Sequence, residues 1–505
     1  LMLAPDYLDH APDRLVLLFQ QVEDDILRDV ARRISKMETL TPTANWQLWR
    51  YQQTEAVRQD VIKKLARYTG KSESAIRQLM QEAATRALEA EDQIYYHYNM
   101  EPTPFAENET LQALLNAGYQ QTAGTFHNLT GTTANTVSGQ FEAALDRAHL
   151  KVSSGAFDYK SAIKSAVDSL ADTMKYVTYP TGHQDTLEVA ARRAVLTGVN
   201  QTAGKLQEAR MDEMHVGFVE TSAHGGARPS HAEWQGRQFH RGGAVDYLGK
   251  HYPDFYEATA YGTGGGIYGW NCAHTHWPIF PELGAPPAWT QESLDALNAR
   301  DIEYDGKKYT QYEINQMQRA RERTVRKYKR RYLAEDAAGA DTTQSAVKLR
   351  AARAELADFT ARTGGRVDSA RTMVSGFGRS QSSKATWAAK KQERLDAVNN
   401  DLTELRQSDK IRMTGAAVVP PALPNTLNFE GHSLEQMAKR QISLAQANEI
   451  AEHAILAISQ RNGTQHSYYS DKGFIVIKQD GSIGTVGWLD DGGKQIVEVM
   501  KKHGF

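Results

Sequence analysis

Two long stretches of this sequence contain no proline, and they are the feature that most restricts its fold. One runs over residues 105–179 and the other over residues 288–419, and both consist mostly of helix-forming residues. Because proline removes a backbone donor and breaks a helix interior, stretches of this length without it are typical of long helices. The sequence therefore predicts helical regions on both sides of the middle of the chain.

The segment between these stretches has a different composition. Residues 215–289 hold seven of the sixteen histidines, four of the eight tryptophans and the only cysteine, Cys272. Glycines are also dense here, which permits tight turns and close backbone contacts, so we expect a compact, loop-rich module. The run Gly262–Gly266 (GTGGG) lacks the GxxxxGK[ST] pattern of a phosphate-binding loop, and we interpret it as a flexible turn.

The first part of the chain predicts helices. Over residues 13–37 apolar side chains recur every three or four positions, which places them on one face of an amphipathic helix. The opposite face includes Glu23 and Asp24, which we expect to be solvated. Residues 46–90 predict further helix, interrupted by a turn at residues 70–72 (GKS).

The overall composition is that of a folded protein with nearly balanced charge. The chain has 505 residues, of which 40% are hydrophobic and 24% charged, with 59 Lys+Arg against 61 Asp+Glu. Domains of about 100–200 residues would give two to four units. No stretch approaches the roughly 18 uninterrupted apolar residues that cross a bilayer, so we expect no membrane span. A single cysteine excludes a disulfide within these residues and any CxxC motif.

One short stretch departs from this balanced charge. Residues 318–332 (QRARERTVRKYKRRY) contain eight basic residues and one acidic residue. Most basic stretches are solvated helix faces, but a cluster of this size also suits phosphate or an acidic partner. The candidate nucleic-acid-binding residues are Arg321, Arg323, Arg326, Lys327, Lys329, Arg330 and Arg331.

The end of the chain has the pattern of a separate small domain. Residues 433–436 (SLEQ) and 443–446 (SLAQ) match the capping box that starts a helix, and the second helix is expected to bury Ile458. Residues 473–488 alternate around a turn in the manner of a β-hairpin. Residues 494–502 predict a last helix.

Together these patterns predict a multidomain α+β protein, with mainly helical N-terminal and middle regions, a compact central module and a small C-terminal domain containing an antiparallel sheet. The expected parts are a helical region 1–205, the module 206–289, a long, partly basic helical region 290–417, a proline-rich linker 418–427 and an α+β domain 428–505.

The histidines around Cys272 leave three hypotheses open. Zinc prefers four tetrahedral ligands drawn from thiolates and imidazoles. The candidate ligands are His224, His231, Cys272 and His274, with His276 as an alternative to His274. A second hypothesis pairs Cys272 with His231 as a nucleophile and its base. The third is that these side chains hydrogen-bond one another in a loop-rich core, and the spacing favours it because it matches no standard zinc motif.

Several strings of the sequence resemble the minor capsid (head-morphogenesis) proteins of tailed phages, which are encoded beside the portal. The resemblance covers roughly residues 1–330. It is carried by Leu3–Tyr7 (LAPDY), Ile26–Ile34 (ILRDVARRI), Thr43–Gln47 (TANWQ), Arg228–Gly236 (RPSHAEWQG) and Gly269–His274 (GWNCAH).

This resemblance implies a structural protein of the virion. It implies portal and capsid proteins as partners and a place in the phage head after synthesis in the bacterial cytoplasm. It further implies a role in head assembly or entry with the genome. Packaged double-stranded DNA is then the partner expected for the basic helix, through salt-sensitive contacts to phosphates. No cofactor is required by the sequence, and a structural zinc ion is the one candidate.

The C-terminal domain resembles the nuclease or toxin domains found at the ends of some phage head proteins, in the barnase, EndoU and colicin-like group. The likeness lies in the layout and in residues 431–433 (GHS) and 439–440 (KR). It implies an alternative function, a phage-delivered, metal-independent ribonuclease acting on host RNA, which needs a base, an acid and cations. The candidates are His432 or His466 as base, Arg440 and Lys472 as cations, and Thr485 or Tyr469 as hydroxyl donor. Eight basic against nine acidic residues over 430–505 match RNA poorly.

Overall fold

The computed structural model describes residues 3–37, 43–154, 158–179, 181–284, 286–424 and 426–505. The chain divides into two compact units, Leu1–Ser382 and Ser383–Phe505. The first is mainly helical and the second combines helices with an antiparallel sheet, which confirms the predicted multidomain α+β fold. None of the helices in the described part of the chain has both the length and the apolar composition needed to cross a membrane.

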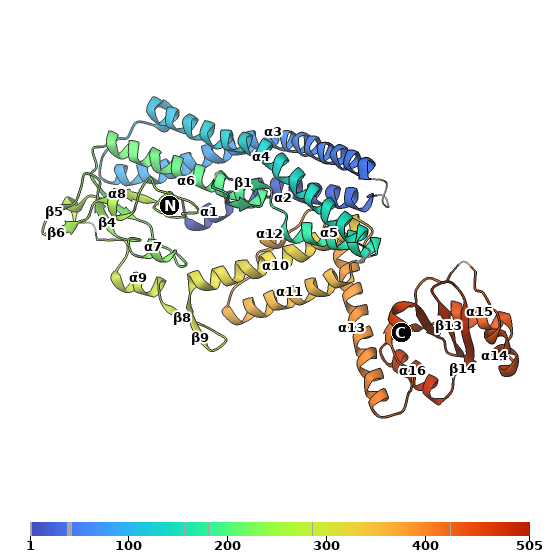
Figure 1. Cartoon of the computed structure of the whole chain (residues 1–505). Coiled ribbons are helices and arrows are strands. Elements are labelled where there is room, and N and C mark those ends of the chain that lie inside the picture. Colours follow the sequence, from blue (N-terminus) through green and yellow to red (C-terminus); the bar gives the residue numbers. More distant parts are fainter. Residues whose placement is uncertain (1–2, 38–42, 155–157, 180, 285, 425) are drawn as a thin grey trace. The chain divides into compact units, whose positions relative to one another are not determined.

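Helices, most of them long, form the body of the first unit (Figure 1). They are α1 (Pro5–His10), α2 (Asp13–Ser35), α3 (Thr43–His97), α4 (Glu109–Ser153), α5 (Tyr159–Thr173) and α6 (Leu187–Glu213), with a short pair β1 (Val177–Thr178) and β2 (Gln184–Asp185) before α6. Helix α3 continues through Gly70, so the turn predicted there is wrong. The cost of about 1 kcal/mol for a helical glycine is outweighed because Leu65 and Ile76, on either side of it, are buried in the bundle core.

Helix α2 buries the face that its apolar spacing predicted, including Leu15, Val22 and Ile26. The expectation that Glu23 and Asp24 are solvated is wrong, since both are buried, with 0% and 2% of their surface exposed. Their charges are compensated by a cation that comes from a helix far along the chain, described below.

Helices α4 and α6 approach closely because glycines face threonines at their contact. A Cβ atom at Gly118 of α4 would lie 2.1 Å from Thr202 Oγ1 of α6, and one at Gly198 of α6 would lie 2.2 Å from Thr122 Oγ1 of α4. Each threonine donates its hydroxyl to the glycine carbonyl one turn earlier on its own helix. The pairs are therefore satisfied without water, and the two backbones pack tightly.

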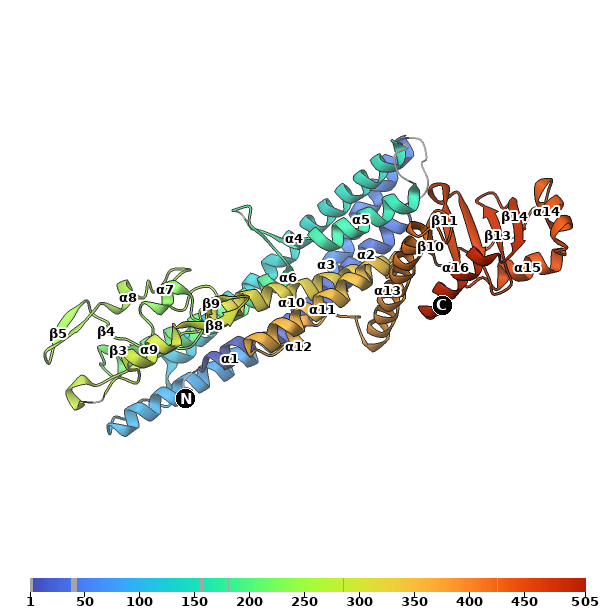
Figure 2. The same cartoon turned by 90° about the horizontal axis from the view of Figure 1, so that it is seen from below.

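The predicted basic stretch lies on a helical hairpin that packs against this bundle (Figure 2). Its elements are α9 (Gln291–Leu297), β8 (Arg300–Tyr304), β9 (Lys307–Thr310), α10 (Gln311–Ala337), α11 (Thr343–Thr363) and α12 (Ser369–Thr372). A capping box between Thr310 and Glu313 starts α10, which contacts α2 and α5. The basic residues of α10 therefore lie beside the acidic residues of the bundle.

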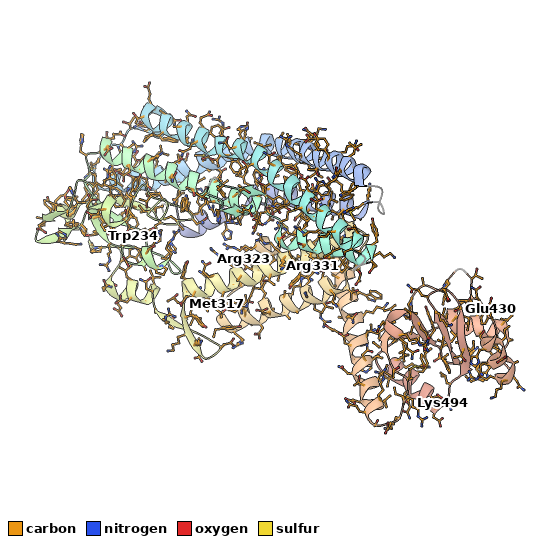
Figure 3. The ribbon with its side chains drawn as sticks, in the orientation of Figure 1. Trp234, Met317, Arg323, Arg331, Glu430 and Lys494 are labelled. Atoms are coloured by element: carbon orange, nitrogen blue, oxygen red, sulfur yellow. The ribbon has the colours of Figure 1, made fainter. Side chains whose placement is uncertain are left out.

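The predicted compact module follows α6 and surrounds a small core of aromatic residues. Strands β4 (Gln238–His240), β3 (Phe218–Thr221) and β7 (His276–Pro278) form its sheet in this order, and β5 (Val245–Tyr247) pairs with β6 (Lys250–Tyr252). Single turns α7 (Pro229–Ala232) and α8 (Phe255–Ala258) lie between strands. Figure 3 labels Trp234, which packs in this core with Phe255, Tyr268 and Cys272.

The second unit contains a five-stranded antiparallel sheet in the order β10–β11–β12–β13–β14. Its elements are α13 (Arg379–Gln407), which begins just before the unit, β10 (Ala416–Val418), α14 (His432–Arg440), α15 (Leu444–Glu452), β11 (Leu456–Gln460), β12 (Gln465–Tyr469), β13 (Gly473–Lys478), β14 (Ile483–Trp488) and α16 (Asp491–Lys502). The hairpin predicted at residues 473–488 is present as β13 and β14. The capping box at Ser443 is confirmed.

Other details of this unit differ from the predictions. Ile458 belongs to β11 and not to the second helix, because α15 ends at Glu452 and a run of short apolar residues then pairs with β12. Ser433 does not cap α14, since its hydroxyl donates to the Glu430 carbonyl instead. The segment 418–427, expected as a linker, lies inside the unit, where Leu423 and Leu427 pack against the sheet core.

Candidate functional site

The central module brings three of the predicted metal ligands together. His231 lies on α7, where Pro229 occupies the start of the turn, while Cys272 and His274 precede β7. All three side chains are buried, with 1% of each residue exposed. Asn200 of α6 donates to the Cys272 carbonyl at 2.9 Å, which fixes this turn against the bundle.

The donor atoms of these side chains converge. His231 Nδ1 and His274 Nδ1 lie 3.3 Å apart, and Cys272 Sγ lies 3.9 Å from the first and 3.7 Å from the second. The ring of Trp234 closes one side, with its centroid 4.6 Å from that of His231 and 4.8 Å from that of His274. A set of one sulfur and two nitrogens can hold a borderline-soft metal ion.

The outer nitrogens of both rings face fixed acceptors. His231 Nε2 lies 2.8 Å from the Gly265 carbonyl, and His274 Nε2 lies 3.1 Å from Gln235 Oε1. That oxygen also accepts from the His224 backbone, while Gln235 Nε2 donates to Asn298 Oδ1. Both rings therefore carry their proton on Nε2, which leaves the lone pair on each Nδ1.

Burial sets the charge state of this cluster. Desolvation lowers the pKa of His231 to about 4 and holds the pKa of His274 well below its usual range. Desolvation also raises the pKa of the Cys272 thiol. A buried thiol of this kind lacks the thiolate character of a nucleophile, which argues against the predicted Cys272–His231 catalytic pair.

The other two candidate histidines have different surroundings. His276 hydrogen-bonds Tyr268 through Nδ1 at 2.5 Å, and its Nε2 lies 2.8 Å from Glu208 Oε1, so both of its nitrogens face groups outside the cluster. Burial alone would raise the pKa of Glu208. The neighbouring His276 ring and Arg241 guanidinium outweigh this effect and lower that pKa to about 2. The His224 ring lies beside that of His274, with centroids 4.4 Å apart and the planes tilted by 34°, and it does not join the converging set.

Sequence reasoning missed the residues that orient the ligands. Gln235 follows His231 by four positions in the RPSHAEWQG string, so the sequence could have indicated that it lies near this histidine. Gly265 contributes only a backbone carbonyl, which no side-chain pattern reveals. The glycine run that contains it is closely packed only in part: a Cβ at Gly266 would lie 2.0 Å from the Ala260 carbonyl oxygen, whereas one at Gly262 or Gly265 would meet no atom within 4 Å.

The predicted nucleic-acid-binding residues lie on α10, where Figure 3 labels Arg323 and Arg331. Most are engaged within the first unit. Arg321 pairs with Glu355, Arg326 with Glu188, Lys327 with Asp172, Arg330 with Glu23 and Asp24, and Arg331 with Asp168 and Glu335, while Lys329 donates to the Thr372 carbonyl. Arg323 is exposed. This face of the helix is therefore occupied by carboxylates of its own chain.

The predicted catalytic residues of the second unit are only partly assembled. Arg440 Nη1 donates to Thr485 Oγ1 at 3.2 Å and also to the Val486 carbonyl. His432 is exposed at the other end of α14, about 12 Å away along the helix axis at 1.5 Å per residue. Lys472 pairs with Glu449 at 2.6 Å.

The two remaining candidates of this unit lie on β12. Tyr469 is buried in the sheet core, where desolvation raises the pKa of its hydroxyl. His466 pairs with Ile477 across the sheet, and partial burial lowers its pKa. The described residues thus place a guanidinium beside a hydroxyl but no histidine next to them.

Comparison with known proteins identifies a relationship for the larger part of the chain. The family model described as phage minor capsid protein 2 matches residues 3–361, which covers the bundle, the module and most of the α10–α11 hairpin. No curated protein and no solved structure matches the chain.

Proposed function

This chain belongs to the phage minor capsid protein 2 family, and from that premise we propose that it is a portal-associated component of a tailed-phage head. The family gives it a structural role in the virion. The finer proposal is that it contacts the portal, helps head assembly and enters the host with the DNA. The observation that carries the proposal is the match itself, which extends over residues 3–361.

The end of the bundle where α3 begins and α4 ends offers a surface for this contact. Trp46 stacks on His149 at 4.3 Å and Arg50 binds Asp146 at 2.6 Å, so these two helix ends are joined. Large apolar side chains remain exposed near them: Leu48 (59%), Tyr51 (68%) and Leu150 (67%). Exposed apolar side chains gathered in one region are typical of protein interaction sites.

Co-expression with the portal protein of the same phage tests this proposal. We expect the full chain to co-purify with the assembled portal, and the double variant Leu48→Glu/Tyr51→Glu to lose this association while remaining folded. The matched control is Leu248→Glu, which changes a side chain of equal exposure (67%) in the central module. The proposal fails if the unchanged chain does not associate, or if the control and the double variant behave alike.

Contact with packaged DNA remains a prediction for the exposed part of α10. Arg323 is exposed, and Lys327, whose side chain is 43% exposed, pairs with Asp172 at 3.2 Å. A phosphate could therefore reach these two residues more readily than the buried arginines. We expect weak binding to duplex DNA that falls with salt and falls again in Arg323→Ala, and unchanged binding in that variant would refute this contact.

An enzymatic role is the second candidate, and it concerns residues 383–505 alone. This unit lies outside the matched residues and places Arg440 beside Thr485, a cation next to a hydroxyl. We propose metal-independent RNA cleavage as its activity. The full chain incubated with tRNA in the presence of a chelator should cleave it, with loss of activity in His432→Ala and Arg440→Ala. Absence of cleavage by the unchanged chain, or variants that cleave as fast as the unchanged chain, excludes the proposal.

A further inference from the structure

The two buried histidines beside Cys272 present an electrostatic conflict. Because each ring donates its Nε2 proton outward, two lone pairs face each other across 3.3 Å. The thiol of Cys272 has one proton and can satisfy only one of them. A cation held between the donor atoms would satisfy both lone pairs at once.

The distances among these atoms match those of a bound zinc ion. Tetrahedral zinc, with bonds of about 2.0–2.1 Å to nitrogen and about 2.3 Å to sulfur, separates two nitrogens by about 3.3 Å and nitrogen from sulfur by about 3.6 Å. The corresponding separations here are 3.3 Å between the nitrogens, and 3.7 Å and 3.9 Å to sulfur. The three donor atoms are therefore already spaced to bind one shared metal ion.

The surroundings also have the character of a metal site. Histidines that bind metals usually donate their second nitrogen to a carbonyl or carboxylate, which fixes the tautomer and the ring orientation. Gly265 and Gln235 supply these acceptors for His231 and His274. The Gln235 amide is itself held in one orientation by Asn298 and by the His224 backbone.

We propose that His231, Cys272 and His274 bind one zinc ion, with a solvent molecule in the fourth position. In the part of the chain that the structure describes, no fourth histidine, cysteine or carboxylate belongs to this group. The ion would join α7 to the turn before β7, since its ligands His231 and Cys272 are 41 positions apart in the sequence. Its binding energy would therefore contribute to folding of the module. This inference is independent of the portal contact.

Cobalt(II) is the most direct probe, because the chain has a single cysteine. The full chain, stripped of metal under reducing conditions, is titrated with Co²⁺ and then with Zn²⁺. We expect the visible bands of tetrahedral cobalt and a thiolate-to-cobalt charge-transfer band, both saturating at one equivalent and both removed by one equivalent of zinc. Only Cys272 can give the charge-transfer band. If the unchanged protein shows no such band at saturating cobalt, the proposal is overturned.

Variants then assign the ligands. Cys272→Ser should lose the charge-transfer band, and His231→Gln and His274→Gln should bind cobalt much more weakly. Gln235→Leu, which removes only an orienting contact, should weaken binding about 10–100-fold. His251→Gln is the matched control, because the side chain of this histidine is 63% exposed and pairs with Asp246, away from the cluster. A charge-transfer band that persists unchanged in His231→Gln and His274→Gln would contradict the proposed ligand set.

Discussion

The guanidinium of Arg330 on α10 donates a hydrogen bond to the carboxylate of Glu23 on α2, and the two residues are 307 positions apart in the sequence. The same guanidinium binds Asp24 at 3.0 Å and lies 3.5 Å from Glu188 of α6. One cation thus compensates carboxylates from two bundle helices. This contact explains how α2 buries two acidic residues and attaches the α10–α11 hairpin to the bundle.

Removing this cation should destabilise the first unit strongly. We expect Arg330→Met to lower the free energy of unfolding by about 3–5 kcal/mol, because it removes the cation that pairs with the buried carboxyl groups of Glu23 and Asp24. Hydrogen exchange of peptides from α2 and α6 measures the effect locally. Arg323→Met, on the exposed side of the same helix, is the control and should change stability by less than about 0.5 kcal/mol. Equal effects of the two substitutions would contradict this role of Arg330.

The same cluster should make stability depend on pH. Burial, opposed by Arg330 and reinforced by Glu188, raises the pKa of Glu23 from 4.5 to about 7. The folded chain therefore holds more protons than the unfolded chain between these values. The free energy of unfolding should fall as pH rises through this window and level off above it.

The variant Glu23→Gln isolates this effect, because Arg330 keeps Asp24 and Glu188 as partners. It should resemble the unchanged protein below pH about 5 and be more stable above pH about 8, by at most about 3 kcal/mol. Urea unfolding at the two pH values provides the comparison. A variant that loses stability at high pH would show that the Glu23 carboxylate is favoured in its ionised form.

The glycines of α4 supply a matched pair for testing the contact with α6. Gly118→Ala should destabilise by about 1–3 kcal/mol, since its Cβ would overlap the Thr202 side chain. Gly124→Ala, on the same helix with no atom within 4 Å of the new Cβ, should stabilise by about 0.5–1 kcal/mol. Thermal unfolding of both variants tests the contact, and stabilisation by Gly118→Ala would show that the helices can separate.

The sequence predicted the local structure of α2 but not its electrostatics. The three-to-four spacing of apolar residues identified the buried face correctly. Glu23 and Asp24 were assigned to solvent, because amphipathic patterns carry no information on partners elsewhere in the chain. Arg330 was assigned to DNA for the same reason: a run of basic residues indicates local charge, whereas its ion pairs depend on tertiary packing.

Part of the candidate metal site was also predictable. The density of histidine, tryptophan and glycine indicated a compact module, and three of the four first-choice ligands converge there. Sequence spacing could not exclude His224, whose ring lies beside that of His274 but does not belong to the converging group. The Gly265 carbonyl could not be found from side-chain patterns, although it sets the tautomer of His231.

In the second unit the hairpin was predicted and the rest of the sheet was not. The turn at Asp480-Gly481 between alternating strands is a strong local signal. Strand β11 has the sequence LAISQ, whose short apolar run is equally compatible with a buried helix. Its pairing with β10 and β12 decides between the two, and that information is not local.

Quantitative mass spectrometry of purified phage particles tests the central claim, a structural role in the head, most directly. Isotope-labelled peptides from α4 and from the second unit are measured alongside peptides of the portal protein. The account predicts a fixed, low number of copies per particle, in constant ratio to the portal and retained after washing at high salt. Particles that lack the α4 peptides, or that contain them in a ratio to the portal varying between preparations, would contradict it.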